Sequence, residues 1–249
     1  MNTRDDAAAD AQPATAPERR LYGRRRGRPL RPTQRRLMEE LLPALRLALP
    51  QQGGLSPRAL FPRPVARIWL EAGFGAGEHL AAQAAAHPEI GFLGAEVFEN
   101  GIARLLTEVE HRKLDNLRLF IDDARLLLAA LPAASLDRVF ILFPDPWPKE
   151  RHKKRRLVSR ATLDVLAGVM AEGGELRLAT DDPDYAQEML ARTREHPEFA
   201  CLAQGSQDWP ERPADWPMTR YEQKARAAGR PPLFLRLVRR ARGAGGDGV

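Results

Sequence analysis

Three glycines on alternate positions form the part of the sequence best suited to hold a ligand. The segment from Leu70 to Leu80 places Gly73, Gly75 and Gly77 between an apolar run and a stretch with helical periodicity. Glycine permits positive φ angles and lets the backbone approach a ligand closely. A dinucleotide-binding turn reads Gly-x-Gly-x-x-Gly, whereas the third glycine here comes one position too early, which breaks the spacing that cradles phosphates. The sequence therefore predicts a ligand turn that is not built for a pyrophosphate.

Carboxylates flank this turn and follow the next two predicted strands. Glu71 and Glu78 would repel a pyrophosphate, and acids combined with glycines suit a phosphate-free ligand with a positively charged end, such as S-adenosylmethionine. Glu96 ends the second predicted strand about 20 residues beyond the turn, the spacing at which a carboxylate accepts both ribose hydroxyls. Asp123 follows the third strand, where it can accept from the adenine amino group. The alternative for each acid is a helix N-cap or first-turn charge, but their placement at consecutive strand ends favours a cofactor site.

A stiff loop after the fourth predicted strand is the expected place of reaction. It runs from Phe143 to Lys149 as Phe-Pro-Asp-Pro-Trp-Pro-Lys, and each proline fixes φ and removes a backbone donor. Asp145 is thereby held at a strand end beside the switch point of the sheet, where a substrate should meet the cofactor. Trp147 is available to pack on a base. The alternative is a structural proline turn whose aspartate caps the next helix.

Positive charge gathers in two runs, Arg19 to Arg36 and Lys149 to Arg160. The formal net charge is +6, so an extended polyanion, nucleic acid first, is the expected partner. The first run reads either as a flexible arm that grips RNA or as a tail that only improves solubility. The second run reads as a set of phosphate contacts or as a solvated helix face.

The elements that must position these residues alternate between strand and helix patterns. The expected strands are Val65–Leu70, Ile90–Glu96, Leu117–Ile121, Leu136–Leu142, Glu175–Ala179 and Leu233–Val238. The expected helices after the first strand are Glu78–His87, Asn100–Arg112, Ala124–Leu131, Leu157–Met170 and Pro183–Glu195. This alternation is typical of a doubly wound α/β fold, with a mostly parallel sheet, right-handed crossovers and helices on both faces. We expect the last strand to be an antiparallel edge strand.

Composition sets the domain boundaries. Residues 1–20 are rich in Ala, Asp and Pro and are expected to form a disordered leader. Residues 21–62 should form a basic extension with one helix, from Thr33 as N-cap to Leu49. Residues 63–240 hold the alternating pattern and should form one domain, and residues 241–249 a flexible tail.

Several classes of protein are excluded by composition. Cys201 is the one cysteine in 249 residues, so the chain can form neither an intramolecular disulfide nor a cysteine metal cluster, and a reducing cytoplasm fits. No apolar stretch approaches the roughly 18 residues of a membrane span. His79 and His152 lack metal-ligand spacing with other residues, so no metal is expected.

Several motifs together resemble the bacterial tRNA (guanine-N7)-methyltransferase family. These motifs are Leu70–Glu78, Gly94–Val97, Phe143–Lys149 with Arg151–Arg156, Ala179–Asp181 and Thr219–Lys224. They span Leu70 to Lys224 in the family's order, and the proline-tryptophan-basic motif is specific by itself. The resemblance implies a Rossmann-like methyltransferase fold with a seven-stranded sheet. It also implies transfer of a methyl group from S-adenosylmethionine to N7 of a variable-loop guanine in tRNA.

By position, the resemblance sorts residues into three groups. The cofactor and the reaction site would be lined by Glu71, Gly73, Gly75, Gly77, Glu96, Asp123 and Asp145. The substrate would be contacted by Lys149, Asp181, Thr219, Arg220, Tyr221 and Glu222. The RNA would be bound by Arg151, His152, Lys153, Lys154, Arg155 and Arg156.

The chemistry implied by this resemblance needs no general base, because guanine N7 already carries an in-plane lone pair. The site must align N7, methyl carbon and sulfur, and compensate the positive charge that moves onto the purine. We expect Asp145 to be the catalytic residue, orienting the guanine by accepting from its N1 and amino hydrogens, with Asp181 and Glu222 as further candidates for that edge. A non-catalytic RNA-binding module and a methyltransferase of another substrate are the alternatives. Monomer and homodimer both remain open.

Overall fold

The computed structural model describes residues 22–51, 54–202 and 212–242. The leader expected at 1–20 and most of the expected tail lie outside the described residues. One sheet dominates the described part, with the strand order β3-β2-β1-β4-β5-β7-β6. Its strands are β1 (Arg67–Ala72), β2 (Ile90–Ala95), β3 (Leu117–Phe120), β4 (Leu136–Leu142), β5 (Met170–Thr180), β6 (Phe199–Cys201) and β7 (Leu233–Arg239).

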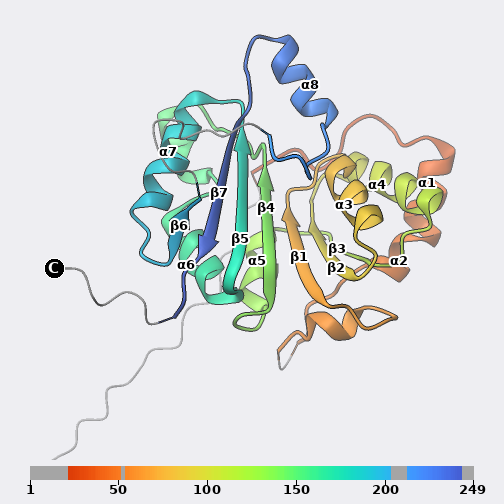
Figure 1. Ribbon diagram of the computed structural model, residues 1–249. Helices are drawn as coiled ribbons and strands as arrows, with labels where there is room; N and C mark the ends of the chain where they lie inside the picture. Colours follow the sequence, from red (N-terminus) through yellow and green to blue (C-terminus); the bar gives the residue numbers. More distant parts are fainter. Residues whose placement is uncertain (1–21, 52–53, 203–211, 243–249) are drawn as a thin grey trace, which may run out of the picture.

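The sheet is parallel from β3 to β5 and antiparallel beyond. β1 pairs in parallel with β2 and β4, β2 with β3, and β4 with β5, whereas β7 runs antiparallel to both β5 and β6. In Figure 1 the arrows of β1, β4 and β5 point up and that of β7 points down. The predicted doubly wound fold and the antiparallel direction of the last strand are therefore confirmed. The prediction that this strand forms the edge is wrong, because β6 pairs with its other side through Ala200 and Val238.

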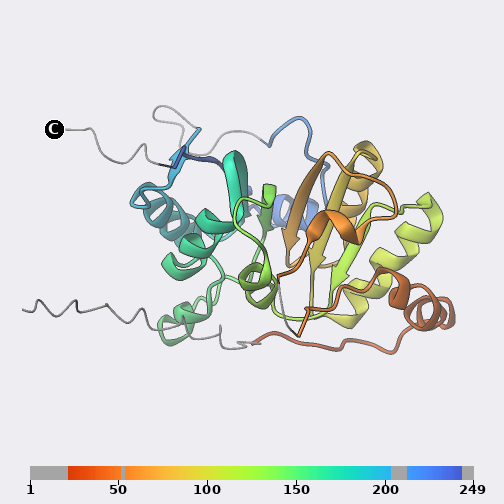
Figure 2. The ribbon, with the colours of Figure 1, turned by 90° about the horizontal axis from the view of Figure 1, so that it is seen from below.

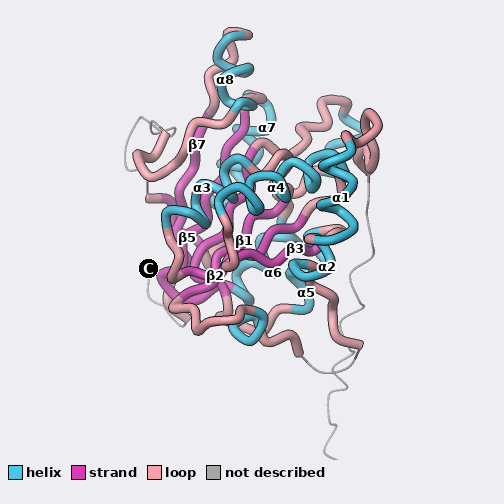
Figure 3. The backbone as a smooth tube through the Cα atoms, turned by 90° about the vertical axis from the view of Figure 1, so that its right-hand side faces the viewer, coloured by secondary structure: helices cyan, strands magenta, loops and turns pink. Residues whose placement is uncertain are grey.

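Helices cover both faces of the sheet. They are α1 (Pro32–Glu40), α2 (Leu42–Leu45), α3 (Glu78–Ala86), α4 (Glu99–Arg112), α5 (Ala124–Ala130), α6 (Arg160–Val169), α7 (Pro183–Arg194) and α8 (Arg220–Ala227), with 3-10 helices η1 (Pro57–Leu60) and η2 (Glu150–Arg155). The helices α1, α3 and α4 lie together on one face, where Figure 3 shows them in front of the strands. The helices α5, α6 and α7 contribute side chains to the core of the other face.

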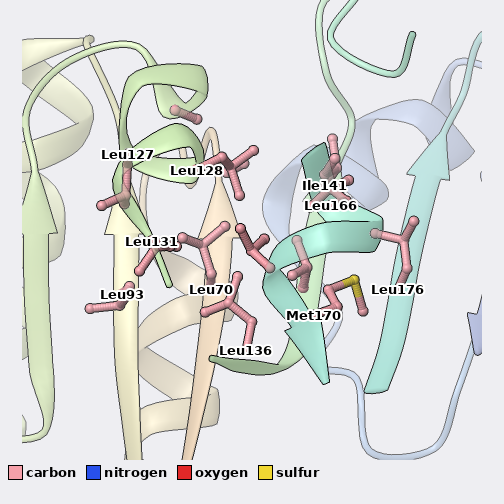
Figure 4. Close-up of a cluster of buried hydrophobic side chains, with 14 of the residues drawn as sticks. Leu70, Leu93, Leu127, Leu128, Leu131, Leu136, Ile141, Leu166, Met170 and Leu176 are labelled. Atoms are coloured by element: carbon pink, nitrogen blue, oxygen red, sulfur yellow. The ribbon is translucent and has the colours of Figure 1, made fainter. Parts of the chain in front are cut away.

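Two clusters of buried side chains hold these layers together. On one face Leu70 and Leu136 of the sheet pack with Leu127 of α5 and Leu166 of α6, as Figure 4 shows. The other face is richer in aromatic residues. Burying a large aliphatic side chain contributes about 1.5 to 3 kcal/mol, so these clusters fix the sheet and with it the strand ends that carry the polar residues.

Element boundaries differ from the predictions where proline or capping decides them. The single helix expected from Thr33 to Leu49 is two helices, because Pro43 in the first turn of α2 cannot continue α1. The N-cap of α1 is Arg31, not Thr33, since Pro32 occupies the first helical position. Similarly, α6 starts at Arg160 instead of Leu157, where the Ser159 hydroxyl accepts from the backbone of the first turn.

Four further differences concern three strands and α8. β1 begins and ends two residues later than expected, and β5 begins at Met170, five residues earlier than the predicted strand. Neither the three-residue β6 nor α8 was predicted. These additions complete the seven-stranded sheet and place a helix beyond the carboxyl ends of the parallel strands, at the top of Figure 1.

Candidate active site

A pocket of about 770 Å³ opens at the carboxyl ends of the parallel strands. It is lined by residues of the glycine turn after β1, by the ends of β2 and β4, and by the first turn of α8. Ligands of open α/β sheets bind at this edge, where neighbouring crossovers leave in opposite directions and open a crevice. In this protein the crossovers diverge between β1 and β4.

The three glycines of the turn differ in the space available around their Cβ positions. All have positive φ, at 77° for Gly73, 55° for Gly75 and 73° for Gly77, a region that side chains disfavour. A Cβ on Gly77 would lie 2.7 Å from Leu105, so this position also allows α3 and α4 to pack. A Cβ on Gly73 or Gly75 would meet nothing within 4 Å. The two first glycines therefore leave open a backbone cradle that faces the pocket.

Glu71 and His79 form a buried pair beneath this cradle. The Glu71 Oε2 and His79 Nδ1 atoms are 2.7 Å apart, and both residues are 3% exposed while lining the pocket. Since the ionised carboxylate only accepts, Nδ1 donates. His79 Nε2 has no hydrogen-bond partner among the described residues. The pair places the Glu71 carboxyl group at the base of the turn.

Glu96 is tied to the same turn by backbone donors. Its Oε2 accepts from the Gly75 N–H at 2.8 Å, and its Oε1 accepts from Val97 and Phe98 at 2.6 and 2.9 Å. Burial raises the pKa of the Glu96 carboxyl above its usual 4.5, although the three backbone bonds oppose that shift and nearby Asp145 adds to it. A carboxylate has about four acceptor positions, so one, on Oε2, is left for a ligand hydroxyl without displacing a backbone donor.

Asp123 lines the pocket and caps a helix at the same time. Its Oδ1 accepts from the Arg125 N–H at 3.0 Å at the start of α5, and the Arg125 guanidinium lies 3.2 Å away. The N-cap role that the sequence left as the alternative is therefore present. Asp122, the residue before it, also lines the pocket.

The loop that follows β4 carries Asp145 into the pocket in a strained conformation. Phe143 and Trp147, which flank Asp145, have φ angles of 51° and 44°, values that cost about 1 to 3 kcal/mol for a residue with a side chain. Asp145 is exposed, and an ideal Cβ on Gly23 would lie 3.8 Å from its Oδ2. The prediction of a stiff loop that presents Asp145 agrees with this geometry.

The predicted substrate residues divide into two groups. Thr219, Arg220 and Tyr221 line the pocket, and the Tyr221 ring lies 4.9 Å from that of Phe143. Burial, and then the charges of Asp181 and Asp145, raise the pKa of the Tyr221 hydroxyl.

The remaining predicted substrate residues lie outside the lining. Lys149 is exposed beside the pocket, and Asp181 pairs with Arg230 at 3.2 Å. Glu222 is 0% exposed and pairs with Arg226 at 3.0 Å and Arg212 at 3.5 Å. Glu222 therefore lies buried outside the pocket lining in this structure, and its contact with the substrate remains a prediction.

The basic run after the loop folds into η2 and does not present all its charges to solvent. Arg151 and Lys154 are exposed, whereas Lys153 pairs with Glu150 at 3.0 Å and Asp184 at 3.2 Å. Desolvation, and then the positive charges of neighbouring residues such as Arg155, lower the pKa of His152.

Two arginines of this run have partners within the protein. The Arg155 guanidinium lies 4.8 Å from the ring centroid of Tyr22 and 4.9 Å from that of Trp147. Arg156 is 2% exposed, bonds to Pro146 O at 2.7 Å and pairs with Asp184 and Glu188. The donors of Arg156 are therefore turned inward in this structure, away from the RNA contact that the resemblance implies.

Sequence reasoning missed that the N-terminal segment reaches the pocket. Tyr22, Gly23 and Arg24 belong to its lining. The segment is tied down on α4, where Gly27 N donates to Asn100 Oδ1 at 2.6 Å and Asn100 Nδ2 donates to Arg28 O at 2.7 Å. In Figure 2 it runs, red-brown, from beside η2 to α1. Tyr22, the one aromatic residue in a basic stretch, is the signal that could have revealed it.

Within the described residues, no three His, Cys, Asp or Glu side chains are grouped as metal ligands. No helix in that part of the chain is long and apolar enough to cross a membrane.

Comparisons with known proteins identify the family. A family model described as "Putative methyltransferase" matches residues 65–235. The tRNA (guanine-N(7)-)-methyltransferase of Rhodospirillum rubrum is 54% identical over 228 residues, covering 90% of this chain and 89% of that protein. The protein of the same name from Paramagnetospirillum magneticum is 52% identical over 231 residues, covering 92% and 96%. A solved 16S rRNA (adenine(1408)-N(1))-methyltransferase from Catenulisporales acidiphilia is more distant, with 18% identity, a TM-score of 0.49 and coverage of 78% and 98%. The chain belongs to the tRNA (guanine-N(7)-)-methyltransferase family.

Proposed function

We propose that this protein transfers a methyl group from S-adenosylmethionine to N7 of a guanine in tRNA, in the variable loop that the family resemblance indicates. The observation that carries the proposal is the convergence of Glu71, Glu96 and Asp145 on one pocket beside a glycine cradle. The two relatives named above, at 52% and 54% identity over most of both chains, support the same reaction. A site of action in the cytoplasm fits a tRNA substrate and a lone cysteine.

The pocket fits this cofactor by the chemistry of its donors and acceptors. The carboxylate of Glu71, 3% exposed at the base of the turn, suits the charged amino group of the methionyl part. Glu96 has one acceptor position on Oε2 for a ribose hydroxyl, and Asp122 and Asp123 lie where the adenine end would rest. The open space at Gly73 and Gly75 admits the ligand against the backbone. Glu71 and Glu78 line the pocket at the turn and would repel a pyrophosphate, which separates this pocket from a dinucleotide site.

The task of the protein is alignment and electrostatic compensation. When bound, S-adenosylmethionine supplies an electrophilic methyl group on a sulfonium centre. Guanine N7 attacks with its own lone pair, so no side chain removes a proton before the bond forms. Orienting a nucleophile within the pocket can contribute several kcal/mol, and fixed carboxylates stabilise the positive charge that develops on the purine.

Asp145 is the residue proposed to orient the guanine. Its carboxylate is exposed at the end of β4 and lies next to the Tyr221 and Phe143 rings, on which a base can stack. A carboxylate accepts from the N1 and amino hydrogens of guanine, whereas adenine presents an unprotonated N1 to it. The contact would therefore select guanine as well as hold it.

The exposed basic residues beside the pocket supply the phosphate contacts. Arg151 and Lys154 on η2, Lys149 before it and Arg25 on the N-terminal segment are exposed. Such contacts give affinity that falls with salt and carries little base information. Arg155 and Tyr22 pack together and line the pocket that also holds Asp145, so an RNA bound to the neighbouring basic residues can reach Asp145.

The direct test incubates the purified full chain with labelled S-adenosylmethionine and unmodified tRNA. We expect label in N7-methylguanine, and none in a transcript whose variable-loop guanine is replaced by adenine. Asp145→Ala should lower turnover by about a hundredfold or more, while Asp115→Asn, a change at an exposed residue paired with Arg63, should leave it unaltered.

Each alternative predicts a different result in this test. Binding of tRNA without any label would favour a non-catalytic module. Label entering a protein or small molecule but not tRNA, with tRNA binding that ignores salt, would favour another substrate. Unchanged turnover in the Asp145 variant would refute its role.

A further inference from the structure

The first turn of α8 is held by a residue from the cofactor turn. Glu78 directly follows Gly77 and is the first residue of α3. Its Oε2 accepts from the backbone N–H of Arg220 at 2.7 Å, and its Oε1 accepts from the Arg220 guanidinium. The two residues are 142 positions apart in the sequence. The contact therefore joins the turn proposed to hold the cofactor to the helix proposed to contact the substrate.

Glu78 completes the cap of α8. The first backbone N–H groups of a helix have no partner within it. Thr219 Oγ1 accepts from Glu222 N at 3.2 Å, which satisfies one of these donors in the usual way. Arg220 N, the first of the helix, is satisfied by Glu78 instead. A carboxylate at this end also interacts favourably with the helix dipole.

A second residue of α3 supports the chain that leads into α8. Gln83, little more than one turn beyond Glu78, donates to the Asp215 carbonyl at 2.6 Å. The Trp216 ring is 1% exposed and lies 5.4 Å from the ring of His79. The first turn of α8 also contacts the Asp145 loop, through the rings of Tyr221 and Phe143. The turn is thus fixed between the two loops that form the pocket, with Glu78 as its polar contact on the cofactor side.

We propose that Glu78 is a positioning residue, which by capping α8 holds Thr219 and Tyr221 at the mouth of the pocket for the guanine. The inference rests on the proposed function. Glu78 acts on the substrate through α8 and does not bind the guanine itself. Loss of its carboxylate should therefore weaken productive tRNA binding more than cofactor binding, because the backbone cradle at Gly73 and Gly75 stays in place.

The test compares Glu78→Ala and Glu78→Gln in the full chain. The alanine variant should raise the KM for tRNA about tenfold, the effect of losing one cap, while the Kd for S-adenosylhomocysteine stays within about twofold. The glutamine variant should recover most of the loss, because its amide oxygen can still accept from Arg220 N. Gln83→Ala is the matched control: it removes a contact to the same segment without touching the cap, so it should lower the Tm and leave the KM for tRNA unchanged.

A second measurement does not depend on turnover. Hydrogen exchange at the backbone of residues 220–223 should quicken about tenfold in Glu78→Ala and remain near the wild-type rate in Glu78→Gln. Turnover of the wild-type chain tests the proposed function, whereas the ratio of variant to wild type tests Glu78, so the two can fail separately. The inference would be overturned if the exchange rate and the KM for tRNA were unchanged in the alanine variant. It would also be overturned if the KM for tRNA rose equally in both variants, or if the affinity for S-adenosylhomocysteine fell in parallel with that for tRNA.

Discussion

Replacing Glu96 by glutamine should raise the Kd for the cofactor. The size of the increase follows from the hydrogen bonds that the Glu96 carboxylate makes. Three backbone N–H groups occupy acceptor positions on its two oxygens, two on Oε1 and one on Oε2. A glutamine has one carbonyl oxygen, which will stay with the pair from Val97 and Phe98. Its amide nitrogen then replaces Oε2 and can accept neither from Gly75 nor from a ribose hydroxyl. A hydrogen bond to a charged group contributes about 1.5 to 3 kcal/mol, so the Kd should rise about ten- to a hundredfold.

Titration calorimetry with S-adenosylhomocysteine measures this change, and Glu99→Gln provides the control. Glu99 lies three residues along, begins α4 and pairs with Arg26 at 3.1 Å outside the pocket lining. Its substitution makes the same chemical change and should leave the Kd within about twofold. Thermal denaturation of both variants separates weaker binding from loss of the fold.

The pH dependence of cofactor affinity and of stability gives a second test of the ribose role of Glu96, because the direction of each change is predicted. Burial raises the pKa of the Glu96 carboxyl above 4.5, and only the ionised form accepts at both oxygens. Cofactor affinity should therefore fall as the pH drops through that raised value. Stability moves the other way, because a carboxyl with a raised pKa stabilises the fold below its unfolded value and loses that contribution as the pH rises through the folded one.

The comparison of wild type with Glu96→Gln isolates this group, since the variant lacks the titration in both measurements. A Kd within twofold of wild type, or identical pH profiles for the two proteins, would refute the ribose role of Glu96.

Four further substitutions test the packing at two helical glycines and the roles of two arginines. Alanine normally stabilises a helix relative to glycine by about 1 kcal/mol, so Gly168→Ala in α6, where a Cβ meets nothing within 4 Å, should raise the Tm. Gly101→Ala in α4 should lower both the Tm and cofactor affinity, because its Cβ would overlap the Gly75 carbonyl oxygen. Arg156→Met should lower the free energy of unfolding by about 2 to 3 kcal/mol, less than for a fully buried pair since Asp184 is half exposed. It should leave the salt dependence of tRNA binding unchanged, whereas Arg151→Met should reduce that slope by about one.

The sheet could be predicted from the sequence where burial on both faces leaves a continuous apolar run. This was the case for β2 and for the second half of β4, Val139–Leu142, and the bounds of both strands agree with the predicted strands to within one residue. β6 has three residues and no pattern of its own, and it exists because β7 offers a free edge. α8 follows a segment rich in proline and tryptophan, and its start depends on a cap supplied from α3, a contact that no local pattern can reveal.

The site shows a similar division between local and distant information. The glycine turn, Glu96 and Asp145 were predictable, because parallel strands bring their carboxyl ends to one edge and each residue sits just after a strand. The inward orientation of Glu222 and the arrival of Tyr22 at the pocket depend on partners far along the chain, including Arg212 for the first and Trp147 for the second. A charge pattern predicts how many cations a segment carries but not which of them find carboxylates within the fold.

Arg156 shows why that distinction matters for the chemistry. A reaction without proton transfer depends on alignment, so the loop that carries Asp145 must hold its shape before a ligand binds. Two of its residues are in the left-handed region, and such residues persist only when their surroundings hold them. The loop is fixed at one end by the bond from Phe143 N to Ala179 O at 2.8 Å and in its middle by the bond from Arg156 Nε to Pro146 O. Asp184 and Glu188 of α7 fix the same guanidinium, which stacks 4.6 Å from the Tyr185 ring centroid. Arg156, which the sequence pattern assigned to RNA, thus stabilises the strained loop from within the protein. Because α7 holds the Arg156 guanidinium, the position of Asp145 also depends on α7.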